Sequence, residues 1–119
     1  MKNQPFASRL GFALTGVLSA LRSERSFRVH ATAVVAVTAL LVWLRPAPVW
    51  WAVVALACAM VLAAELVNTA MERLADHLHP EAHPGIRQVK DCAAAAVLVA
   101  SVGALAVAAA LAFEIFVRG

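Results

Sequence analysis

The amino-acid sequence predicts an all-α membrane protein with an N-terminal amphipathic surface helix and three transmembrane helices. Composition is the first reason, because 63% of the 119 residues are hydrophobic, only 14% are charged and the mean hydropathy is +0.82. A soluble domain of this size could not keep its surface polar with so few charged residues. The second reason is that long apolar runs alternate with short polar segments, at which membrane helices can end.

The same composition excludes other classes. The net charge of +3 comes from a few Lys and Arg residues at segment ends, and no basic groove with interleaved aromatic residues is evident. We therefore expect no nucleic-acid partner. The two cysteines, Cys58 and Cys92, lie in apolar runs and form neither a disulfide framework nor a metal motif. We expect residues 1–119 to form a single integral membrane domain.

The N-terminal region, residues 1–27, is predicted to be a surface helix followed by a loop. Apolar residues recur there at helical spacing, which is typical of a helix that lies on the membrane surface. They are Phe6, Leu10, Leu14, Val17 and Leu21.

Two breaks divide the remainder into three apolar spans. The first is Arg45-Pro46-Ala47-Pro48, and the second contains two His-Pro steps and Gly85, which favour a loop. Three Trp residues around the first break are typical of a membrane interface. The predicted spans are residues 29–44, 48–75 and 91–115, with a polar loop over 77–90.

Basic residues predict the orientation of these spans. Most of them, including Lys2 and Arg9, lie in the N-terminal region or between the second and third spans. The positive-inside rule then places the N-terminus and the 77–90 loop in the cytoplasm and the C-terminus outside a bacterial cytoplasmic membrane. Three short spans form a thin bundle, so we also expect a homo-oligomer.

Four polar residues end the second span, and they lie on one stripe of the helix. They are Glu65, Asn68, Glu72 and Asp76. Placed about 100° apart per residue, they fall within an arc of about 80°. Carboxylates at the end of a membrane helix are costly, so we expect them to face protein, water or bound ions.

This stripe and its polar neighbours suit phosphoryl transfer at the membrane surface. Such a site needs oxygen ligands for Mg²⁺, a cation on the phosphates of ATP and a base for the attacking hydroxyl. Carboxylates at headgroup level could reach a lipid alcohol within the bilayer. The neighbours are Glu24, Arg28, His30, Glu81, His83, Lys90 and Asp91. No Gly-rich phosphate loop or protein-kinase signature is present.

The stretch from Glu65 to Asp76 resembles the signature E-x-x-N-S/T-A-x-E-x-x-x-D of the prokaryotic diacylglycerol kinases. The resemblance continues in Glu81-Ala82-His83-Pro84, in Lys90-Asp91 and upstream in Glu24-Arg25-Ser26-Phe27-Arg28-Val29-His30. Together these segments cover about residues 16 to 100, in the order and with the spacing of that family.

The resemblance implies a homotrimeric lipid kinase of the inner membrane, in which neighbouring protomers share active sites. It implies that Glu65 is the general base on the lipid hydroxyl and that Glu24 and Glu72 hold the divalent metal. It assigns ATP binding to Glu24, Glu72, Glu81, His83, Lys90 and Asp91. It gives supporting or lipid-side positions to Asn68, Asp76, Phe27, Arg28 and His30.

Two questions stay open at this point. The sequence Phe27-Arg28-Val29-His30 resembles the Gram-positive branch of the family, where undecaprenol kinases occur, so the lipid is either diacylglycerol or undecaprenol. The competing function is a small oligomeric transporter that uses a membrane carboxylate as a proton relay. It would need polar partners in the other spans, which offer almost none.

Overall fold

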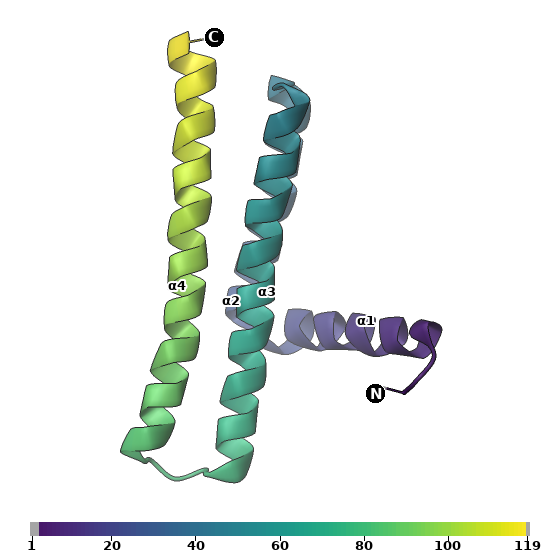
Figure 1. Cartoon of the computed structure of the whole chain (residues 1–119), viewed down its shortest axis with the longest axis vertical. Coiled ribbons are helices and arrows are strands. Elements are labelled where there is room, and N and C mark those ends of the chain that lie inside the picture. The colour runs from purple at the N-terminus through teal and green to yellow at the C-terminus, as the bar shows by residue number, and fades with distance from the viewer. Residues whose placement is uncertain (1–2, 119) are drawn as a thin grey trace.

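The computed structural model describes residues 3–118, which are helical except for short connections (Figure 1). Three of its helices, α2, α3 and α4, are long and apolar enough to cross a membrane, as predicted. Lys2 lies outside the described residues. The helices are α1 (Phe6–Ser23), α2 (Arg25–Leu44), α3 (Pro48–Leu78) and α4 (Pro84–Phe113), and α4 continues into a five-residue π-helix, η1 (Glu114–Arg118).

A single residue, Glu24, separates α1 from α2. Its backbone is extended (φ −113°, ψ 110°), and its N–H donates to the Ala20 carbonyl at 2.8 Å. The Arg28 side chain then donates from Nη1 to the carbonyls of Leu21 and Arg22, at 3.1 and 3.0 Å. These carbonyls have no partner within α1, so Arg28 caps that helix. Helix α2 begins at Arg25, directly after the extended Glu24 and four residues before the predicted start of the first span.

The connection between α2 and α3 matches the predicted break. Arg45 adopts a left-handed conformation (φ 52°), and its N–H donates to the Leu41 carbonyl at 2.9 Å. Pro46 follows and cannot continue the helix. Pro48 then occupies the first turn of α3, where the missing N–H costs no intrahelical bond.

The polar loop is shorter than the predicted 77–90, because α3 extends to Leu78 and α4 begins at Pro84. Pro84 fits the first helical position for the same reason as Pro48. His83 caps this helix, since its Nδ1 accepts the Gly85 N–H at 2.9 Å. A His-Pro step therefore starts the helix here, and Lys90 and Asp91 lie within its second turn.

Helix α3 is the centre of the fold. It packs along α4 over a long interface and along α2 over a shorter one, while α2 and α4 make no direct backbone approach within residues 3–118. Its 31 residues are about 46 Å long at 1.5 Å per residue, against a hydrocarbon layer of about 30 Å. The C-terminal part of α3 therefore has the length to extend beyond the bilayer core. Helix α1 leaves the bundle sideways near this end (Figure 1).

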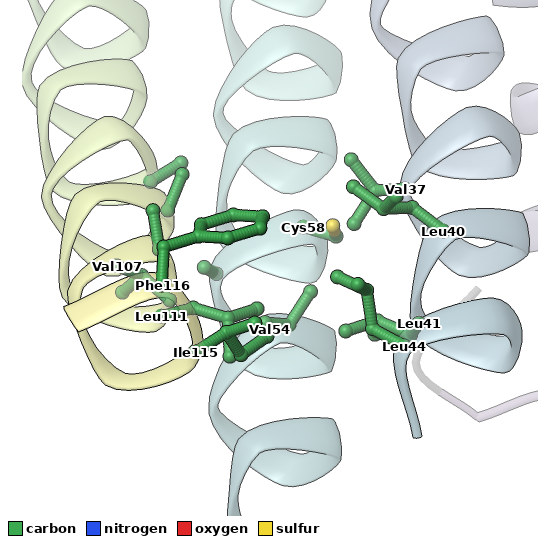
Figure 2. Close-up of a pocket in the computed structure, with 14 residues that line it drawn as sticks. Val37, Leu40, Leu41, Leu44, Val54, Cys58, Val107, Leu111, Ile115 and Phe116 are labelled. Atoms are coloured by element: carbon green, nitrogen blue, oxygen red, sulfur yellow. The ribbon is translucent and has the colours of Figure 1, made fainter. Parts of the chain in front are cut away.

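The small hydrophobic core lies near the opposite end, where Leu41, Val54 and Leu111 of the three long helices are buried. A cavity of about 190 Å³ lies beside it. Figure 2 shows side chains from all three helices around this cavity. They include Val37, Leu40 and Leu44 of α2, Cys58 of α3, Val107 of α4 and Phe116 of η1.

Candidate active site

Glu65 is the one ionisable residue that is buried within residues 3–118, with 4% of its surface exposed. Its Oε1 lies 2.5 Å from Nδ1 of His30 on α2. The two atoms are close, although the ring does not direct an aligned hydrogen bond at the carboxylate. Helices α2 and α3 run in opposite directions, so a residue one turn into α2 meets a residue three turns before the end of α3. This contact joins two of the predicted site residues.

The predicted polar stripe of α3 runs from a buried to an exposed environment. Glu65 is buried, Asn68 and Glu72 are half-buried, and Asp76 is exposed. Asn68 Oδ1 is enclosed and has no hydrogen-bond partner within residues 3–118. Thr69, which was not among the predicted site residues, is 7% exposed and lies one turn after Glu65. Its position in the signature was the signal that could have indicated it.

A polar hollow of about 560 Å³ lies between the end of α3 and the start of α4. It brings together three of the residues predicted to bind ATP: Glu81, His83 and Lys90. The rings of His79 and His83 lie edge to face there, with their centroids 5.1 Å apart. Arg87 also lines the hollow, although its place in the sequence predicted no role for it. Its spacing of four residues from Asp91 was the available signal.

Two ion pairs hold the charged groups beside this hollow. Lys90 Nζ lies 2.5 Å from Asp76 Oδ1 and links α4 to α3. Arg87 Nε lies 3.1 Å from Asp91 Oδ1, one turn along α4. Asp91 does not line the hollow, so Lys90 and Asp91 are neighbours in sequence but have different partners. The Lys90–Asp76 pair connects the hollow to the polar stripe.

Glu24 belongs to a separate cluster around Arg73 of α3. Arg73 Nη2 lies 3.4 Å from Glu24 Oε1, and the guanidinium also donates to Ser23 Oγ at 2.5 Å and Ser19 Oγ at 3.2 Å. Arg73, Ser19 and Ser23 were not predicted. Their contact depends on how α1 meets α3, for which the local sequence contains no signal.

Two of the predicted lipid-side residues, Phe27 and Arg28, make contacts within the protein. Phe27 is 3% exposed and is therefore packed inside the protein. The Arg28 guanidinium caps α1, as described above. His30 is the member of this group that contacts the polar stripe.

An apolar groove starts at His30 and runs toward the far end of the bundle. A cavity of about 370 Å³ is lined by His30 and Val34 of α2, Val61 of α3 and Ser101 of α4. It shares four lining residues with the cavity of Figure 2, namely Val37, Cys58, Ala104 and Ala108. The two cavities together extend from His30 to Leu44, about 20 Å along α2 at 1.5 Å per residue. The groove therefore begins beside Glu65 and ends near Trp50.

The buried Glu65 carboxylate of α3 thus lies between the apolar groove and the polar hollow that follows this helix. Comparison with known proteins places the chain in a family. The model of the family described as "Prokaryotic diacylglycerol kinase" matches residues 11–112. The chain belongs to the prokaryotic diacylglycerol kinase family. The match includes the polar stripe, the loop between α3 and α4, and the groove apart from the groove residues in η1.

Two relatives within this kinase family have names that specify different lipids. A "Diacylglycerol kinase" of Synechocystis sp. is 36% identical over 101 residues, which are 84% of this chain and 58% of the relative. An "Undecaprenol kinase" of Bacillus subtilis is 33% identical over 87 residues, which are 73% of this chain and 71% of the relative. The chain thus spans little more than half the length of the first relative. The transporter alternative is not favoured by these matches.

Proposed function

We propose that this chain is an ATP-dependent lipid kinase that transfers the γ-phosphoryl group of ATP to the hydroxyl of a membrane lipid. The lipid is diacylglycerol, giving phosphatidic acid, or undecaprenol, giving undecaprenyl phosphate. Family membership and the names of both relatives support this reaction. Both lipids present a primary hydroxyl at the end of long hydrocarbon chains, and so the same chemistry serves either.

The position of Glu65 is the observation that carries the proposal. It is a buried carboxylate beside the start of an apolar groove, where a lipid hydroxyl could approach from the membrane. Asp76, the partner of Lys90, lies about three turns further along the same helix. An extended nucleoside triphosphate covers a comparable distance. The base and ribose would lie at the hollow, with the γ-phosphate toward Glu65.

Each of these residues has a separate role in the proposed phosphoryl transfer. The lipid oxygen attacks the γ-phosphorus, its proton passes to the Glu65 carboxylate, and the bond from the γ-phosphorus to the β,γ-bridging oxygen breaks to release ADP. Lys90 and Arg87 supply positive charge for the phosphates, while Glu81 and His83 bind the nucleoside end at the hollow. Asp91 lies beside the hollow, where it pairs with Arg87, and contacts the ribose from there. Asn68 and Asp76 support these groups. No covalent intermediate on the enzyme is required, because the two substrates react in line.

Glu72 and Glu24 are the residues that would hold a divalent cation. Mg²⁺ usually binds one or two carboxylates together with substrate phosphates, and this donor set has that chemistry. Glu72 is half-buried on the stripe, whereas Glu24 is 3.4 Å from Arg73. Within residues 3–118, no three Asp, Glu, His or Cys side chains gather at one point, so phosphate oxygens would complete the coordination. When bound, the cation neutralises charge on the phosphates.

The apolar groove is the proposed binding site for the hydrocarbon chain of the lipid, which would lie along α3. Its lining is almost entirely apolar, and His30 lies at the end beside the proposed reaction centre. We also propose that the protein works as a homotrimer in the bacterial cytoplasmic membrane, with α1 on the cytoplasmic surface. Many large apolar side chains of the three long helices are exposed, which supports contact with lipid and with other copies.

Reconstitution tests this function directly. The full chain is placed in vesicles that contain either diacylglycerol or undecaprenol, and transfer of labelled γ-phosphate from ATP with Mg²⁺ is measured. We expect phosphate on at least one of the lipids. Glu65→Gln is expected to fold and oligomerise but to lose turnover by about 10²–10⁴-fold, since it removes the general base. Absence of transfer to both lipids would overturn the proposal, and full activity of Glu65→Gln would remove Glu65 as the base.

A further inference from the structure

Glu65 is enclosed, so a proton that it accepts during the reaction needs a route out of the protein. With 4% of its surface exposed, its carboxylate has little access to water. Each phosphoryl transfer leaves one proton on a general base, and that proton must depart before the next lipid can react. Asn68, the next polar residue of the stripe, is enclosed, and its amide has no titratable proton with which to relay one.

His30 is placed between Glu65 and the outside of the protein. Its Nδ1 is enclosed and lies 2.5 Å from Glu65 Oε1, yet 32% of the His30 side chain is exposed. The ring also lines the 370 Å³ cavity of the groove, which has residues of α2, α3 and α4 in its lining. Nδ1 of His30 therefore contacts the buried carboxylate, while another part of the side chain is exposed at the protein surface.

The other elements around His30 bring no competing charge. Glu65 is its ion-pair partner from α3, and the Cys58 thiol lines the same cavity. The α4 residue of this cavity with a polar side chain is Ser101. On its own helix, Arg28 is directed to carbonyls of α1. Within residues 3–118, Glu65 thus has one titratable side chain in contact, and it is an imidazole, which can accept a proton at one nitrogen and release one from the other.

We propose that His30 carries the proton away from Glu65 after each transfer and so acts as a positioning and proton-exchange residue. The inference rests on the proposed kinase reaction. The lipid hydroxyl proton first passes to the Glu65 carboxylate. It then passes to His30 Nδ1, and the proton on Nε2 leaves to water or buffer. The ring is then left with a proton on Nδ1; when it rotates away from Glu65, that proton passes to water while Nε2 takes one up, which restores the starting tautomer.

Removal and replacement of the imidazole tests this role. In the reconstituted full-length protein, His30→Ala is expected to lower kcat by about 10- to 100-fold, with KM for ATP within about twofold of the wild-type value. Added imidazole is expected to restore a large part of kcat, because it can enter the vacated space and carry the proton. Pyrrole has the same ring size but cannot carry a proton in this way, and we expect it to have no effect.

Three controls keep the test decisive. His30→Gln keeps much of the side-chain volume and polarity and is expected to have a low kcat in a normally folded protein, which guards against misfolding of His30→Ala. His77→Ala changes an exposed histidine of α3 and is expected to leave turnover unchanged. Glu65→Gln is expected to gain nothing from imidazole, because the general base itself is missing.

The possible results separate this inference from the proposed function. Wild-type turnover in His30→Ala, a loss that imidazole does not reverse, or equal rescue by pyrrole would each overturn the proton-exchange role. An inactive wild-type protein would instead count against the kinase proposal, and the His30 test requires an active wild type as its reference.

Discussion

Arg73 of α3 contacts Glu24, the single residue between α1 and α2, through Nη2 at 3.4 Å from Oε1. The same guanidinium donates to Ser19 and Ser23, so one side chain of α3 holds the last turn of α1. Glu24 is also a proposed metal ligand. The attachment of α1 and the position of the proposed ligand Glu24 therefore depend on one arginine.

Arg73→Ala is expected to loosen α1 while leaving the three long helices in place. The lost pair is partly exposed, with 50% of the Arg73 and 33% of the Glu24 side chain accessible, so the cost is about 1 kcal/mol. Hydrogen exchange should become faster in residues 6–23 and remain unchanged in α3 and α4. Arg25→Ala is the matched control, since Arg25 is exposed and forms no ion pair within residues 3–118. Unchanged protection of α1 in Arg73→Ala would contradict this assignment.

Lys90→Met is expected to weaken ATP binding more than the chemical step. Lys90 lines the hollow beside Arg87 and is held by Asp76, so its removal lowers the positive charge available to phosphates. We expect KM for ATP to rise about 10-fold, which corresponds to about 1.4 kcal/mol. Gln88→Met, on the same helix but outside the hollow, serves as control and should behave as the wild type. Equal KM values in the two variants would exclude Lys90 from the nucleotide site.

Glu72→Gln is expected to raise the Mg²⁺ concentration needed for half-maximal turnover by about 10-fold or more, because an amide is a weaker ligand than a carboxylate. Binding of Mn²⁺ in the presence of ATP, followed by electron paramagnetic resonance, gives a readout that is independent of turnover. The control is Glu114→Gln, which alters a carboxylate of η1, beyond the end of α4, where it pairs with Arg118 at 3.5 Å. If Mn²⁺ binding were the same in both variants, Glu72 would not be a ligand.

Ala104→Phe tests whether the groove holds the hydrocarbon chain of the lipid. Ala104 lines both cavities, so the larger ring would fill the space where they join. We expect KM for the lipid to rise several-fold without a comparable change in KM for ATP. Ala106→Phe places the same ring at an exposed position of α4 outside both cavities. A similar effect of both substitutions would indicate a general disturbance of the membrane surface instead.

The sequence alone determined the membrane class, the three apolar helices and the polar stripe of α3. Apolar runs of this length and the Pro-containing breaks are local properties, and helical periodicity places residues three and four apart on one face. The signature from Glu65 to Asp76 also indicated the family, and the match of the family model to residues 11–112 confirms it. The paired ends Glu114 and Arg118 follow from the same spacing.

Tertiary structure decided the contacts between helices, because they depend on how antiparallel helices slide along one another. It paired His30 with Glu65, Arg73 with Glu24 and Lys90 with Asp76. It also showed that Glu65 is buried while Asp76, on the same stripe, is exposed. Periodicity assigns a residue to a face of its own helix, but burial and partners are set by the neighbouring helix that covers that face. The carboxylate of Glu65 was visible in the sequence, and its histidine partner became visible only when α2 was laid against α3.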